Sequence, residues 1–129
     1  MAFNVLIVDD SNIVRMVTKK TFGMTSIPVN KFYEADNGKT ALEIITNNWI
    51  DLVLLDINMP IMTGMEFMEM LNAHPDQKNL PVIVVSTEGS KDRIEEMKRY
   101  GVKDYLRKPV SPEELVRVLT DVFGEIPHE

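Results

Sequence analysis

Short apolar runs alternate along this chain with longer stretches in which apolar residues recur every three or four positions. Three of the runs, "NVLIV" (4–8), "DLVLL" (51–55) and "PVIVV" (81–85), are rich in branched aliphatic residues and lack polar alternation. Strands that are covered on both faces have this pattern. "KFYEA" (31–35) and "DYLR" (104–107) are weaker strand candidates. The pattern therefore predicts five strands.

The stretches between these runs have helical periodicity. In "SPEELVRVLTDVF" one apolar stripe at helical spacing comprises Leu115, Val118, Leu119 and Val122. Ser111 is a suitable N-cap, Pro112 suits the first helical position, and Glu114 stands where it would complete a capping box. Four further helices are predicted at 11–22, 38–47, 64–73 and 91–100, and Gly101 would end the last of them.

Strand and helix alternate five times, an order typical of a parallel sheet with helices on both faces. We therefore predict a doubly wound (βα)5 α/β fold with a five-stranded parallel sheet and right-handed crossovers. No linker rich in Pro, Ser or Gly divides the 129 residues. We expect one domain over residues 1–129, with a core from about 3 to 123 and a short C-terminal tail.

Composition narrows the class of protein. The chain has no cysteine, which excludes disulfide scaffolds, thiol catalysis and Cys-based metal sites. No apolar run approaches the ~20 residues of a membrane helix, and the N-terminus lacks the basic region and cleavage site of a signal peptide. A net charge of −6 argues against nucleic acid as a partner. We expect a cytoplasmic monomer.

Reactive side chains follow the predicted strands. Asp9 and Asp10 end the first strand, Asp56 ends the third, and Lys108 ends the fifth. Ser86 and Thr87 follow the fourth in the same way. In an open parallel sheet, ligands bind beyond the carboxyl ends of the strands. We therefore expect three acids, two hydroxyls and one lysine to converge on one edge.

A cluster of three carboxylates needs compensation. Two carboxylates ~4 Å apart repel each other by about 4 kcal/mol at an effective dielectric constant of ~20. A raised pKa, the ammonium of Lys108 or a divalent cation would offset this repulsion. Carboxylate oxygens with waters and a phosphate oxygen suit Mg²⁺. A carboxylate in such a site can attack phosphorus to form an aspartyl phosphate, with Ser86 donating a hydrogen bond to the product and Lys108 meeting a phosphate oxygen.

Each of these residues also has an ordinary interpretation. A single Asp after a strand is often a helix cap, and Ser86 with Thr87 could simply begin a helix. Tyr105 could be a half-buried aromatic of the sheet. In the methionine-rich segment, Met65 and Met68 are expected to fill the core, and Trp49 is expected to pack against the end of the second helix.

Four segments together resemble the receiver domain of bacterial response regulators, of the stand-alone, CheY-like type: "VLIVDDSNIVR", "DLVLLDINMPIMTG", "VIVVSTEG" and "DYLRKPVSPEEL". The resemblance spans essentially the whole chain and implies a flavodoxin-like fold. It implies that Asp56 accepts a phosphoryl group from a phosphohistidine of a sensor histidine kinase. Such a protein is a signalling switch that catalyses only its own phosphoryl transfer and autodephosphorylation.

The resemblance also assigns roles around Asp56. Asp10 would ligate Mg²⁺ directly, as would Asp56 and the backbone carbonyl of Asn58, whereas Asp9 would act through water. Lys108 would contact the phosphoryl group, and its bond to Pro109 would be cis.

Ser86 and Thr87 would lie at the phosphoryl group. Ser86 matches the switch hydroxyl, where threonine is commoner, and Tyr105 matches the aromatic that reports phosphorylation. Asn58 and Glu88 would tune the rate of dephosphorylation.

The output of the switch is expected to be a protein–protein contact, because we expect no DNA-binding or enzymatic domain after residue 129. In this family the surface of the fourth helix, fifth strand and fifth helix meets targets, which here includes Ile94, Met97, Tyr100 and Tyr105. Chemotaxis is the favoured pathway, and a phosphorelay intermediate is the alternative. A phosphatase with an aspartate nucleophile is a further alternative, but Asn58 stands where such enzymes carry a second acid.

Overall fold

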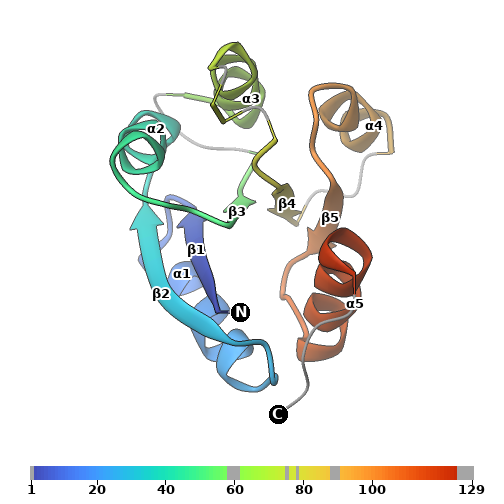
Figure 1. Ribbon diagram of the computed structural model, residues 1–129. Helices are drawn as coiled ribbons and strands as arrows, with labels where there is room; N and C mark the ends of the chain where they lie inside the picture. Colours follow the sequence, from blue (N-terminus) through green and yellow to red (C-terminus); the bar gives the residue numbers. More distant parts are fainter. Residues whose placement is uncertain (1, 58–61, 75, 78, 88–90, 125–129) are drawn as a thin grey trace.

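One five-stranded parallel sheet, with the strand order β2-β1-β3-β4-β5, forms the centre of the computed structural model (Figure 1). The structure describes residues 2–57, 62–74, 76–77, 79–87 and 91–124. The strands are β1 (Phe3–Val8), β2 (Val29–Ala35), β3 (Leu52–Leu55), β4 (Val82–Ser86) and β5 (Asp104–Arg107). The helices are α1 (Asn12–Gly23), α2 (Gly38–Asn47), α3 (Gly64–Ala73), α4 (Lys91–Arg99) and α5 (Pro112–Phe123). The predicted (βα)5 fold is confirmed.

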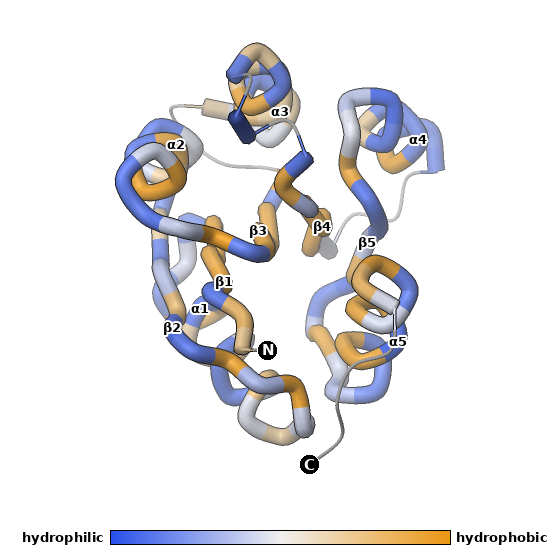
Figure 2. Tube along the Cα trace, viewed as in Figure 1, coloured by the Kyte–Doolittle hydropathy of each residue, from blue (hydrophilic) through white to orange (hydrophobic). Residues whose placement is uncertain are grey.

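Helices cover both faces of the sheet, α1 and α5 on one side and α2, α3 and α4 on the other (Figure 1). Alternate residues of each central strand enter one of two cores. Leu6 and Val53 pack with Phe67 of α3, whereas Leu54 packs with Leu119 of α5. Because both faces are buried, the central strands are almost wholly hydrophobic, as Figure 2 shows.

The edge strand β2 is less hydrophobic than the central strands, and its prediction was short by two residues. It begins at Val29 rather than Lys31. Burial along β2 follows no regular alternation, because this edge strand pairs only with β1. Hydrophobicity alone therefore does not mark where the strand begins. Backbone pairing with β1 extends the strand to Val29.

Capping residues fix the helix starts. Ser111 accepts a hydrogen bond from the backbone N–H of Glu114, which confirms the predicted N-cap of α5. The Glu114 carboxylate pairs with Arg117, 3.0 Å away, so the predicted capping box is not formed there. A complete capping box is present at the start of α3, between Thr63 and Glu66.

The order of the strands reverses at β1, since the chain passes from β1 to β2 on one side and later to β3 on the other. Such a reversal opens a crevice beyond the carboxyl ends of the adjacent strands. Val8 of β1 is paired with Leu55 of β3, and the Asp56 N–H donates to the Val8 carbonyl at 2.9 Å. This register sets Asp9 and Asp56 side by side at the crevice.

Among the described residues, none of the helices combines the length and apolar character that a membrane crossing would require.

Candidate functional site

Three carboxylates meet at the carboxyl edge of the sheet. Asp9, Asp10 and Asp56 each offer one oxygen, and these oxygens all lie within 4.8 Å of one another. Asp9 and Asp56 are buried, whereas Asp10 is exposed. The expected convergence of the three acids is confirmed. Hard oxygen donors grouped in this way are suited to a divalent cation such as Mg²⁺.

Lys108 provides a positive charge within this cluster. Its Nζ lies 2.6 Å from Oδ2 of Asp9 and 3.6 Å from Oδ2 of Asp56. Its backbone N–H donates to the Ser86 carbonyl at 3.0 Å, so the ends of β4 and β5 hold the lysine in place. The predicted cis bond between Lys108 and Pro109 is confirmed.

Asp9 is anchored through all three of its oxygens. Oδ2 pairs with Lys108, Oδ1 accepts the N–H of Ser11 at 2.8 Å, and the backbone carbonyl accepts a hydrogen bond from Nη1 of Arg15. Because both carboxylate oxygens already have donors, Asp9 is less available than Asp10 to bind a cation directly. Sequence reasoning missed Arg15. The available signal was its place one turn after Ser11, since helical side chains lean back toward the N-terminus.

The hydroxyl groups occupy two different environments. Ser86 is buried at the end of β4, with 1% of its surface exposed, whereas Thr87 is exposed. Tyr105 Oη donates to the Ser86 carbonyl at 3.2 Å, which links this tyrosine to the end of β4. Thr87 and Lys108 also line a largely apolar groove of about 350 Å³ against α1. Asn58 and Glu88 lie outside the described residues.

The predicted target surface needs one correction. Met97 is fully buried in the core beneath α4, so it cannot contact a partner. Its burial follows from the helix packing, which turns Met97 toward the sheet. Ile94, Tyr100 and Tyr105 are partly buried and keep some exposed surface. The core position predicted for Met68 is confirmed, whereas Met65 is partly buried and packs against the same core.

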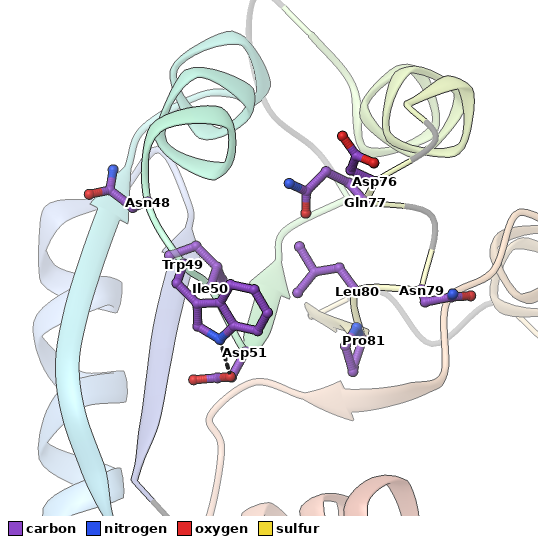
Figure 3. A pocket seen from close by; sticks show the side chains of 9 residues that line it. All are labelled: Asn48, Trp49, Ile50, Asp51, Asp76, Gln77, Asn79, Leu80 and Pro81. Atoms are coloured by element: carbon purple, nitrogen blue, oxygen red, sulfur yellow. Dashed lines mark hydrogen bonds between the residues drawn. The ribbon is translucent and has the colours of Figure 1, made fainter.

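A second pocket, of about 350 Å³, lies at the opposite edge of the sheet beside the amino ends of β3 and β4 (Figure 3). Trp49 lines it and is 78% exposed, so the expectation that it packs against the end of α2 was wrong. Its indole Nε1 donates to Asp51 Oδ1 at 2.8 Å, and the neighbouring Ile50 takes the buried position instead. This pocket is separate from the acid cluster.

The chain as a whole can also be compared with known proteins. The family model of the response regulator receiver domain matches residues 5–120. The chain belongs to this family. A chemotaxis protein CheY homolog of Campylobacter jejuni is 34% identical over 120 residues, which cover 92% of this chain and 91% of that protein.

Solved structures agree with this assignment. The chemotaxis response regulator CheY4 of Vibrio cholerae superimposes with a TM-score of 0.82 at 31% identity, covering 95% of this chain and 99% of that one. The receiver domain of the Pseudomonas aeruginosa sensor histidine kinase PA1611, solved with a magnesium ion in its active site cleft, has a TM-score of 0.81. At 21% identity over 97% of this chain and 100% of that one, this second likeness concerns the fold.

Membership of the family gives the receiver domain its general role. Receiver domains of this type are signalling switches rather than classical enzymes; histidine kinases phosphorylate them, and they act on downstream targets. They bind Mg²⁺ in an acidic site, and the cluster of Asp9, Asp10 and Asp56 fits such a site.

Proposed function

We propose that this receiver domain is switched by phosphorylation of Asp56 and signals in chemotaxis. One observation carries the assignment of Asp56. Asp9 and Asp56 are both buried at the ends of central strands, but Lys108 Nζ pairs with Asp9 at 2.6 Å and lies 3.6 Å from Asp56. The Asp56 carboxylate is therefore held in a fixed place while the lysine remains within reach.

In the proposed reaction, a carboxylate oxygen of Asp56 attacks the phosphorus of a phosphohistidine on the kinase. A P–O bond forms, the P–N bond breaks, and its electron pair stays on the imidazole nitrogen. The product is an acyl phosphate on Asp56. The lysine ammonium of Lys108 turns from Asp9 toward a phosphoryl oxygen and neutralises part of its charge.

The acid cluster holds the metal in this proposal. Asp10 and Asp56 would bind Mg²⁺ directly, with the backbone carbonyl of Asn58, and Asp9 through water; bound there, the ion would stabilise charge on the phosphoryl group. Before phosphorylation the same carboxylates repel one another. Asp9 keeps its place through Ser11 and Lys108, so the cluster persists in spite of this repulsion.

In this proposal, Ser86 and Tyr105 respond to the phosphoryl group on Asp56. We infer that the hydroxyls of Ser86 and Thr87 donate to the phosphoryl oxygens. The Tyr105 hydrogen bond to the Ser86 carbonyl supports a coupling between the phosphoryl group and this aromatic side chain. The partner would then contact the surface of α4, β5 and α5, through the exposed parts of Ile94, Tyr100 and Tyr105. Asn58 and Glu88 would set the lifetime of the phosphate.

Phosphorylation can be tested with acetyl phosphate and Mg²⁺, followed by intact-mass spectrometry. We expect one added phosphoryl group on the wild type and none on Asp56→Asn. Asp51→Asn is the matched control, because Asp51 stands just before the amino end of the same strand, and it should be labelled normally. Equal labelling of the wild type and Asp56→Asn would exclude Asp56 as the acceptor.

The pathway needs a separate test. The names of the relatives, at about a third identity, support chemotaxis. We expect the phosphorylated protein to bind a flagellar motor-switch protein more tightly than the unphosphorylated one. If phosphate instead reappears on an acceptor histidine of a phosphotransfer domain, the protein is a phosphorelay intermediate. Both outcomes fit a monomer that acts in the cytoplasm.

A further inference from the structure

Arg15 joins three parts of the structure next to the acid cluster. From α1, its Nη1 donates to the backbone carbonyl of Asp9 and its Nε donates to Oε1 of Glu34 on β2 at 3.1 Å. A longer contact of 3.4 Å joins Nη2 to Asn12 Oδ1. The side chain is only 14% exposed. The guanidinium is therefore fixed between the end of β1 and the neighbouring edge strand.

The carbonyl that Arg15 contacts belongs to the peptide between Asp9 and Asp10. A peptide unit is planar, so the direction of its oxygen also sets the position of the next Cα atom. The following peptide is fixed as well, since the Ser11 N–H donates to Asp9 Oδ1 at 2.8 Å. The backbone of Asp10 thus lies between two peptide planes, each held by one hydrogen bond.

The Asp10 side chain has no comparable support. Within the described part of the chain, no hydrogen bond or ion pair holds its carboxylate, which is exposed. Its place within 4.8 Å of the oxygens of Asp9 and Asp56 therefore depends on its backbone. The backbone in turn depends on Arg15 and Ser11.

We infer that Arg15 is a positioning residue for the metal site: by holding the Asp9–Asp10 peptide, it orients the Asp10 carboxylate toward the cation. The inference rests on the proposed function, in which Asp10 binds Mg²⁺. An arginine suits this role, because its rigid planar fork reaches the Asp9 carbonyl and Glu34 together, whereas a lysine ammonium is a compact charge without that fixed geometry.

An effect of the Arg15 charge alone would change the Mg²⁺ affinity in the direction opposite to that expected from positioning. If Arg15 acted only through its positive charge, removing that charge would strengthen the attraction of the cluster for a cation. Arg15→Met would then bind Mg²⁺ more tightly and Arg15→Lys would bind it normally. If Arg15 positions Asp10, both variants bind Mg²⁺ more weakly, because both lose the fork.

The test is a Mg²⁺ titration of the amide NMR spectrum for the wild type, Arg15→Lys and Arg15→Met. We expect both variants to bind at least about tenfold more weakly, the range found when groups that orient metal ligands are removed. Two controls should stay within about twofold of the wild type. Glu34→Gln removes the ion pair but keeps the bond to Asp9, and Arg117→Lys alters an arginine that pairs with carboxylates on α5.

Two further measurements distinguish positioning from a general loss of stability. In the metal-free protein, the order parameter of the Asp10 amide should fall in Arg15→Lys and stay unchanged in Glu34→Gln. In the Asp10→Asn background, Arg15→Lys should cause no further loss of Mg²⁺ affinity, since residues that act through one another are not additive.

Wild-type affinity in Arg15→Lys, or an additive loss in the double variant, overturns the inference while leaving the proposed function intact. Failure of the wild type to bind Mg²⁺ would overturn the proposed metal site itself, and the inference with it.

Discussion

Lys108 Nζ lies 2.6 Å from Oδ2 of Asp9 and 3.6 Å from Oδ2 of Asp56, so the lysine is paired more closely with Asp9 than with the proposed phosphoacceptor. Both carboxylates are buried. Burial of a charge is tolerated when an opposite charge and hydrogen bonds accompany it, and loss of one partner is costly. Lys108 thus has a structural role in addition to its proposed contact with the phosphoryl group.

Removal of Lys108 should therefore destabilise the fold, and Mg²⁺ should partly compensate. We expect Lys108→Ala to lower the free energy of unfolding by about 3 kcal/mol at pH 7 without metal, because Asp9 is left without a cation. The rise in melting temperature on adding Mg²⁺ should be larger than in the wild type. Lys103→Ala, at an exposed position before β5, is the control. An unchanged stability of Lys108→Ala would show that the Asp9 pair contributes nothing.

Magnesium should stabilise the wild type through the acid cluster. At a concentration ten times the dissociation constant, a ligand that binds only the folded state adds about 1.4 kcal/mol. We expect a rise of several degrees in melting temperature at pH 7 and millimolar Mg²⁺, measured against Na⁺ at equal ionic strength. Asp10→Asn should reduce this rise.

The control for this measurement is Asp36→Asn. Asp36 also follows a strand, β2, but lies outside the cluster. Its variant should respond to Mg²⁺ like the wild type. A melting curve of the wild type that does not change with Mg²⁺ would count against the metal site.

Gly64 should not tolerate a side chain. A Cβ atom there would lie 3.1 Å from Cα and 3.3 Å from the carbonyl oxygen of Ile57, next to Asp56. The Gly64 N–H also donates to that carbonyl at 3.1 Å, so the backbone has little freedom to move away. We expect Gly64→Ala to destabilise by about 1–3 kcal/mol in urea unfolding, as overpacking does.

Gly23 provides the comparison for Gly64. It ends α1, and a Cβ atom there would meet nothing within 4 Å. Gly23→Ala should be neutral or stabilise by up to about 1 kcal/mol, the difference in helix propensity. If Gly64→Ala behaves in the same way, the contact with Ile57 is not a constraint.

Glu34 should give a small pH dependence of stability. Its hydrogen bond from Lys19 chiefly lowers its pKa below the usual value, and Arg15 lowers it further against the opposing effect of burial. A carboxyl group with a lowered pKa in the folded state stabilises above its unfolded pKa of 4.5 and loses this contribution as pH falls below it.

Glu34→Gln should therefore cost less than about 1 kcal/mol at pH 7, since the group is partly exposed. The difference from the wild type should shrink as the pH falls from 4.5 toward 3, as measured by urea unfolding across this range. A difference that is constant with pH would mean that the carboxylate charge is not involved.

The sequence by itself determined the elements and the identity of the residues that end the strands. Runs such as "NVLIV" and "DLVLL" are typical of a strand covered on both faces, and parallel strands bring their carboxyl ends to one edge. The gathering of Asp9, Asp10 and Asp56 follows from these two facts. Local signals such as the Ser111 cap could also be predicted from the sequence.

The tertiary structure alone decided which groups touch. Lys108 is 99 residues away from Asp9 along the chain, and its choice of Asp9 over Asp56 depends on differences of about an ångström. The packing of helices and loops against the sheet likewise decides three further features. Met97 is buried, Trp49 is exposed, and Arg15 reaches the Asp9 carbonyl. Periodicity and residue type carry no information at that scale, because they fix the face of an element but not its distance from another.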